Sequence, residues 1–111
     1  MEKRVFESGA SRNSDEDKLD YVGFLNPAVM KIYAQYMHSH RMMEDGSMRE
    51  SDNWQKGIPV DQYMKSLYRH FQDLHLNHRG YESEQNSTDS LCAIIFNAMG
   101  LLLETELKGS L

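Results

Sequence analysis

The chain has 111 residues, of which 12 are Lys or Arg and 17 are Asp or Glu, giving a net charge of −5. This length fits one domain, and a single cysteine excludes both an internal disulfide and a zinc site built on several cysteines. The acidic balance argues against nucleic acid as a partner, because affinity for nucleic acid comes mostly from neutralised phosphates. A small anion in a local basic pocket remains compatible with this charge.

Membrane and secretion signals are weak. The first residues lack the apolar stretch of a secretory signal. The longest apolar run, residues 91–103, is interrupted by Asn97 and Gly100 and is shorter than the ~20 residues that a membrane span needs. We therefore expect a cytoplasmic protein without a membrane partner.

Residues 1–26 are polar and follow neither a helical nor a strand period, which predicts an irregular amino-terminal arm. This arm includes the acidic run 15–17 and a short extended piece at residues 19–24. Residues 27–111 then form the helical domain. The expected fold class is all-α, a compact domain of three main helices.

Local signals place these helices at residues 27–43, 60–77 and 88–107. Asn26 is a good N-cap with Pro27 at the first helical position. The second helix follows the stretch 57–59, has Asp61 or a neighbour as its cap, and ends before Gly80. The third begins within the polar stretch 86–89.

The third helix is apolar on nearly every side between residues 91 and 107, which predicts burial all round. A helix of about 20 residues is ~30 Å long, and two other helices can hardly cover it. We therefore expect a homo-oligomer, either a dimer or a tetramer.

Four segments carry a family resemblance. They are Ser8–Arg12 with Lys18–Tyr21, Asn53–Pro59, Ser66–His70, and Asp89–Leu91 with Asn97. In this order they resemble the amino-terminal domain of phage dATP/dGTP diphosphohydrolases. The resemblance implies a compact helical domain that handles nucleotides in phages or prophages. Two places depart from the family pattern: residues 38–46 lack a Gly-Ala-Lys-Tyr-Gly-like stretch, and Asp89-Ser90 stands where Asp-His is common.

Hydrolysis of a nucleotide would require Mg²⁺ held by several carboxylates. The carboxylate motifs of helical pyrophosphatases and an adjacent His-Asp pair are both missing. Asp73 and Asp89 are the carboxylates that could converge across facing helices. We therefore assign no catalytic residue, no cofactor and no resident metal, with Mg²⁺ at Asp73 and Asp89 as the hydrolase alternative.

The sequence has more residues that suit nucleotide binding than residues that suit hydrolysis. An indole beside a lysine suits a stacked base with a nearby phosphate, and an arginine can grip phosphate bidentately. Trp54 could equally anchor a loop, Asn97 could cross-link helices, and Arg69 could form an ion pair with Asp73 one helical turn away. The candidate nucleotide-binding residues are Arg12, Lys18, Asn53, Trp54, Lys56, Arg69, His70 and Asn97.

Three functions are open at this point. The first is sequestration of a purine-containing nucleotide, for example a cyclic dinucleotide immune signal, by a phage protein that counters host defence without hydrolysing the signal. The second is Mg²⁺-dependent dATP/dGTP diphosphohydrolysis. The third is a helical protein-interaction module. Missing carboxylate motifs favour the first over the second.

Overall fold

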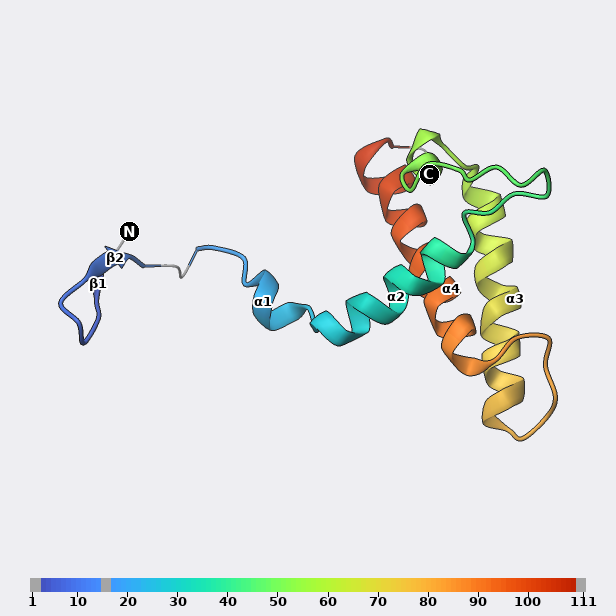
Figure 1. Cartoon of the computed structure of the whole chain (residues 1–111), viewed down its shortest axis with the longest axis horizontal. Helices are drawn as coiled ribbons and strands as arrows, with labels where there is room; N and C mark the ends of the chain where they lie inside the picture. The colour runs from blue at the N-terminus through green and yellow to red at the C-terminus, as the bar shows by residue number, and fades with distance from the viewer. Residues whose placement is uncertain (1–2, 15–16, 110–111) are drawn as a thin grey trace. The chain divides into compact units, whose positions relative to one another are not determined.

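The computed structural model describes residues 3–14 and 17–109, and the chain divides into two units, residues 1–30 and 31–111. Residues 15 and 16 of the acidic run and the last two residues of the helical domain lie outside the described residues. Of the residues that the structure describes, 58% are helical, and they form four α-helices and a small two-stranded sheet (Figure 1). The expected mostly helical fold is confirmed, and the small sheet is an addition that the sequence did not predict.

The sheet lies in the first unit, where sequence predicted an irregular arm. Strands β1 (Lys3–Val5) and β2 (Ser11–Asn13) pair antiparallel, with Arg4 opposite Arg12. Gly9 has a φ of 89°, a conformation that favours glycine, and it closes the turn through a bond from its N–H to the Phe6 carbonyl. The next element is α1 (Tyr21–Phe24). The extended piece expected at residues 19–24 is thus wrong, since the Asp20 carboxylate accepts from Gly23 N–H and caps a helical turn.

Helix α2 (Pro27–Ser39) begins as predicted, because Asn26 Oδ1 accepts from the N–H groups of Ala28 and Val29 at 2.9 and 3.1 Å. It ends four residues before the expected position 43. The cause is pairing within the following segment: Arg49 N–H donates to the Arg41 carbonyl, and Met42 pairs with Met48 in an isolated antiparallel bridge. This pairing makes residues 41–49 a closed loop.

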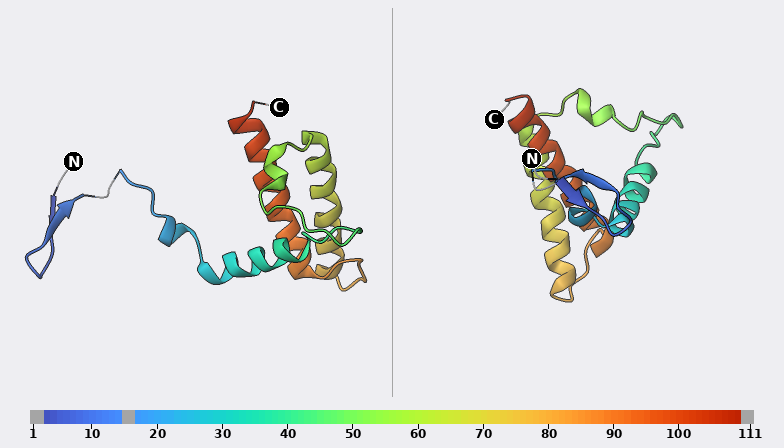
Figure 2. Two further views of the ribbon diagram at one scale, coloured as in Figure 1. Left: turned by 45° about the horizontal axis from the view of Figure 1, so that its top comes forward. Right: turned by 90° about the vertical axis from the view of Figure 1, so that its left-hand side faces the viewer.

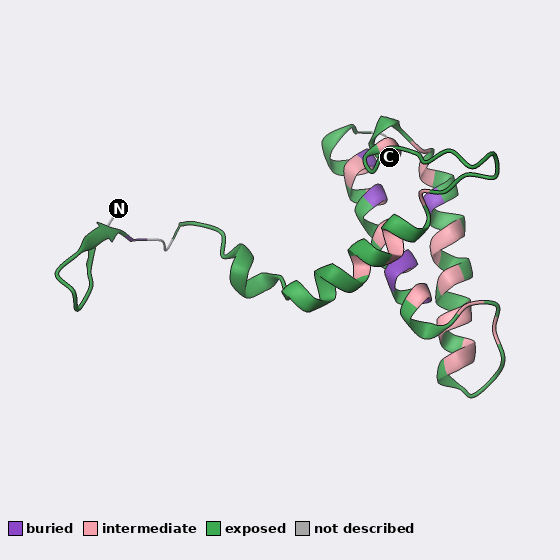
Figure 3. Ribbon diagram, in the orientation of Figure 1, coloured by how far each residue is buried: buried purple, intermediate pink, exposed green. Residues whose placement is uncertain are grey.

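Helices α3 (Val60–His78) and α4 (Ser87–Leu102) lie side by side and run antiparallel (Figures 1 and 2). Asn86 Oδ1 caps α4 by accepting from Asp89 N–H. The buried apolar residues of the described chain are Tyr63 on α3 and Cys92 and Ala93 on α4, and Figure 3 shows buried positions on both helices. The Tyr63 ring lies directly against Gly100, where a side chain would collide with it. This close approach fixes the separation of the two helices.

The short 3-10 helix η1 (Asn53–Lys56) is held by the carboxyl end of the chain, the π-helical turn η2 (Leu103–Leu107). The buried Glu104 carboxylate accepts from Ile58 N–H at 3.2 Å and from Lys108 Nζ at 3.1 Å. Lys108 Nζ also donates to the Gln55 carbonyl at 2.9 Å. These bonds fix η1 beside the helical hairpin and so position Asn53 and Trp54.

Burial of the third predicted helix on all sides is not found within one chain. One face of α4 packs on α3, while large apolar side chains on the opposite face remain exposed (Figure 3). By length and composition the segment Ser87–Leu107 could cross a membrane, although a third of its most apolar stretch is buried inside the fold. The core helix of a soluble protein can have the same length and composition. In this segment Asn97 and Gly100 make interior contacts with α3.

Candidate functional site

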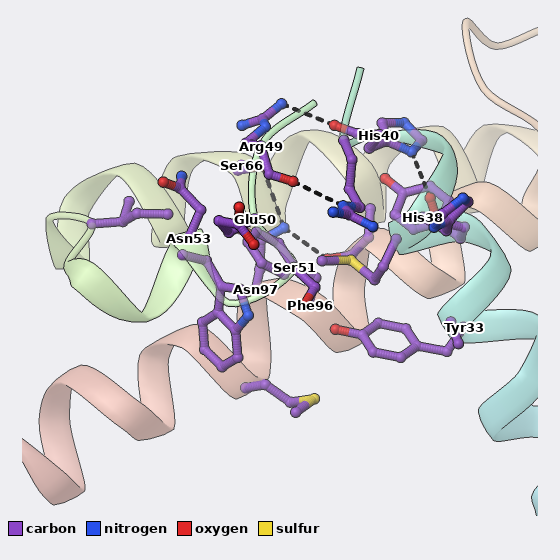
Figure 4. A pocket seen from close by; sticks show the side chains of 18 of the residues that line it. Tyr33, His38, His40, Arg49, Glu50, Ser51, Asn53, Ser66, Phe96 and Asn97 are labelled. Atoms are coloured by element: carbon purple, nitrogen blue, oxygen red, sulfur yellow. Dashed lines mark hydrogen bonds between the residues drawn. The ribbon is translucent and has the colours of Figure 1, made fainter. Parts of the chain in front are cut away.

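A cleft of about 540 Å³ opens in the second unit (Figure 4). Its walls come from the carboxyl-terminal half of α2, the loop that follows α2, η1, and the facing sides of α3 and α4. This volume falls within the range of small-molecule sites. Some of the predicted binding residues line this cleft.

Aromatic rings form much of the cleft. Tyr33 and Tyr36 enter from α2, and Figure 4 shows the Tyr33 ring directed into the space. The Trp54 indole meets the Phe96 ring edge-on, with ring centroids 5.9 Å apart, and Phe96 meets Tyr63 in the same way at 5.8 Å. The half-buried Trp54 therefore anchors η1 and also lines the cleft, and its stacking on a base stays a prediction.

Asn97 contributes a buried amide to the cleft. Its Nδ2 donates to the Ala93 carbonyl at 2.8 Å and to Ser66 Oγ at 3.3 Å, which links α4 to α3. In the described part of the chain both bonds of this amide use its nitrogen. Oδ1 is therefore left as an acceptor for a donor group of a ligand.

His70 is oriented by Gln85, a residue of the loop between α3 and α4. Gln85 Oε1 lies 2.8 Å from His70 Nδ1 and also accepts from Ser90 Oγ at 3.1 Å. A neutral His70 that donates through Nδ1 presents an unprotonated Nε2. The side chain then offers a second oriented acceptor beside Asn97.

Two arginines on the loop after α2 supply the positive charge of the cleft. Arg41 Nε donates to the Arg49 carbonyl at 2.8 Å, and Arg49 Nη2 donates to the His40 carbonyl at 2.9 Å. Each guanidinium has five N–H groups, so four on each remain for a ligand. Within residues 3–14 and 17–109, neither arginine forms an ion pair with a carboxylate. Glu50 is the carboxylate that lines the cleft among the described residues.

The structure brings four of the eight predicted binding residues to this cleft: Asn53, Trp54, His70 and Asn97. Lys56 and Arg69 are exposed and lie outside its lining. The ion pair with Asp73, which was the alternative role for Arg69, is not formed in the described residues. Arg12 lies on β2 and Lys18 follows it, both exposed in the first unit.

Sequence reasoning missed Arg41, Arg49, Tyr33, Tyr36 and Gln85. No motif marks the two arginines, because the pairing between residues 41 and 49 that sets them beside each other is a tertiary feature. One signal was available: residues 38–46 depart from the resembled family pattern and contain two His, two Met and Arg41. That departure coincides with the segment that places positive charge at the cleft.

The Mg²⁺ site of the hydrolase alternative would need a cluster of metal ligands. In the part of the chain that the structure describes, no three His, Cys, Asp or Glu side chains converge as ligands. Asp73 and Asp89 lie near the same end of the helical hairpin, and neither lines the cleft.

The two tyrosines that line the cleft are half-buried. Burial raises the pKa of Tyr33 above its usual 10.0, and the neighbouring Cys92 adds to the rise. Burial also raises the pKa of Tyr36, against the opposing effect of a hydrogen bond with Gln85. In the core, burial and the Glu104 charge raise the pKa of Tyr63. These hydroxyls therefore stay protonated, as donors, at neutral pH.

This burial predicts a stability loss in alkali. Between the unfolded and folded pKa values the folded state binds more protons, so the free energy of unfolding falls as pH rises through about 10. Below that pH the protonated tyrosines make their full contribution to the free energy of unfolding. Among the six tyrosines, tyrosinate absorbance should show a fraction that ionises late, and Tyr33→Phe should remove part of that fraction. A single transition of all six at the unfolded value would contradict this.

No protein-family model, curated protein or solved structure matches this chain. The motif resemblance to phage diphosphohydrolase domains therefore remains a prediction.

Proposed function

We propose that the cleft binds a purine-containing nucleotide and sequesters it without hydrolysis. Cyclic dinucleotide signals of antiviral defence are the ligands to test first, and the place of action is the cytoplasm of a phage-infected bacterium. The observation that carries this proposal is the pair Arg41 and Arg49, without carboxylate partners in the described chain, at the rim of an aromatic cleft.

The chemistry of the lining fits the parts of a nucleotide. Guanidinium groups bind phosphate through parallel N–H bonds. Half-buried aromatic rings at the cleft, such as Trp54 and Tyr33, suit stacking on a base. Asn97 Oδ1 and His70 Nε2 can accept hydrogen bonds from an exocyclic amine or a ribose hydroxyl. A single chain thus offers a contact for each chemical part of the ligand.

Sequestration is supported over turnover by the kind of groups present. The cleft is lined by donors, rings and amides, with Glu50 as the carboxylate among its described lining residues. Hydrolysis of phosphate with Mg²⁺ would call for several convergent oxygen ligands. Mg²⁺-dependent hydrolysis is therefore the second candidate function, and the experiments below distinguish it from sequestration.

Calorimetric titration of the full chain tests binding. The panel contains cyclic dinucleotides, dATP, dGTP and an ADP-ribose derivative, with adenosine and guanosine as controls that lack phosphate. We expect at least one phosphorylated ligand to bind, and its parent nucleoside to bind more weakly by roughly 10-fold or more, since a charge-assisted contact contributes ~1.5–3 kcal/mol. The third function, a protein-interaction module, predicts no binding by any member of the panel.

A further inference from the structure

A straight apolar seam runs along the exposed face of α4. Leu91, Ile95 and Leu102 are 49%, 37% and 60% exposed, and Ala98 is exposed as well. The spacing of four, three and four residues is that of a helix that pairs with another helix. No charged residue occurs between Ser90 and Leu103. A polar or charged partner would therefore find nothing to pair with on this seam.

The seam is symmetric about its own centre. Ile95 and Ala98 are equidistant from the midpoint between Phe96 and Asn97, and so are Leu91 and Leu102. If two copies of α4 pair antiparallel about a two-fold axis at this midpoint, Ile95 of each copy meets Ala98 of the other. A large side chain then faces a small one, and Leu91 meets Leu102 at both ends. Such self-complementarity is the mark of an isologous interface.

We propose that a second copy of this chain covers the seam, with the two α4 helices antiparallel and Ile95 packed against Ala98 of the partner. This inference does not rest on the proposed function. With the flanking residues Ile94, Met99 and Leu101, two such surfaces would bury roughly 1,000 Å², the lower limit for a specific interface. Met99 also lines the cleft, so the partner helix borders the candidate binding site.

Disulfide trapping tests the register. Two differently tagged full-length chains, both carrying Cys92→Ala, receive Leu91→Cys or Leu102→Cys and are mixed before mild oxidation. Antiparallel pairing predicts a disulfide between position 91 of one chain and position 102 of the other, while identical positions are offset by about 16 Å along the helices at a rise of 1.5 Å per residue. Parallel pairing would instead join identical positions when each chain is oxidised alone, and that result would overturn the proposal. Gln72→Cys, exposed on α3, is the matched control and should not cross-link.

Light scattering tests the assembly itself. We expect the natural chain to have twice the mass of one chain at micromolar concentration, and Ile95→Glu to be a monomer with unchanged helix content. Gln72→Glu introduces the same charge on an exposed site of α3 and should remain a dimer. A monomeric natural chain, an Ile95→Glu dimer, or a natural chain that floats with lipid vesicles would each overturn the proposal. The disulfide result does not depend on the Glu variant folding.

Discussion

Replacing Arg49 with alanine should weaken nucleotide binding by roughly 10- to 100-fold, because one charge-assisted hydrogen-bonding group contributes ~1.5–3 kcal/mol. Arg41→Ala should do the same. Each guanidinium gives one bond to the backbone of its own loop and keeps its remaining N–H groups for a ligand. Calorimetry with the best ligand of the panel measures the loss.

Two comparison variants separate ligand contact from loop damage. Arg49→Lys keeps the charge but loses the forked donor, so we expect a partial loss. Lys56→Ala removes an exposed charge outside the cleft and should have little effect. Arg69, which the sequence motif favoured, lies outside the cleft lining, so Arg69→Ala locates the ligand. A loss at Arg69 with none at Arg41 and Arg49 would place the ligand along the exposed side of α3 and refute the proposed cleft.

Gly100→Ala should destabilise the fold, although glycine to alanine in a helix interior ordinarily gains about 1 kcal/mol. The added Cβ would collide with Cε1 and Cζ of Tyr63 and lie 2.7 Å from its hydroxyl. Tyr63 is 1% exposed, so its ring has no free space to enter. Overpacking of this kind typically costs ~1–3 kcal/mol, and thermal unfolding should shift downward by several degrees.

A loss of stability in Gly100→Ala, where alanine would ordinarily stabilise a helix, would show that the Tyr63 ring lies against Gly100. Gln72→Ala, on an exposed site of α3, is the control for alanine in a helix and should be close to neutral. In a double-mutant cycle, Tyr63→Leu combined with Gly100→Ala should cost less than the two separate losses together, because the colliding ring is gone. A stabilised Gly100→Ala chain would show that α3 and α4 are not held at the separation described.

Local sequence signals predicted where α2 and α4 begin. Asn26, Pro27 and Asn86 act within one turn of their own position, and the structure places each at the start of a helix. The end of α2 was wrong because the backbone pairing of residues 41 and 49 overrides a helical pattern. The strands β1 and β2 were missed because three exposed residues each show no alternation of polar and apolar side chains.

The candidate site was only half predictable for the same reason. Asn53, Trp54, His70 and Asn97 were chosen as residue types that suit a nucleotide, and three elements, η1, α3 and α4, bring them to one cleft. Arg41 and Arg49 reach that cleft through a tertiary loop, and Gln85 reaches His70 from the connection between α3 and α4. Neither arrangement has a signature in residue spacing.

Capture without turnover is the central claim, and recovery of the ligand tests it most directly. The full chain is incubated with the bound nucleotide and Mg²⁺, and free nucleotide is then measured by chromatography before and after heat denaturation of the protein. Sequestration predicts that the nucleotide disappears from the free pool and returns chemically intact after unfolding. New phosphate or monophosphate products that accumulate with time would contradict it and establish hydrolysis instead.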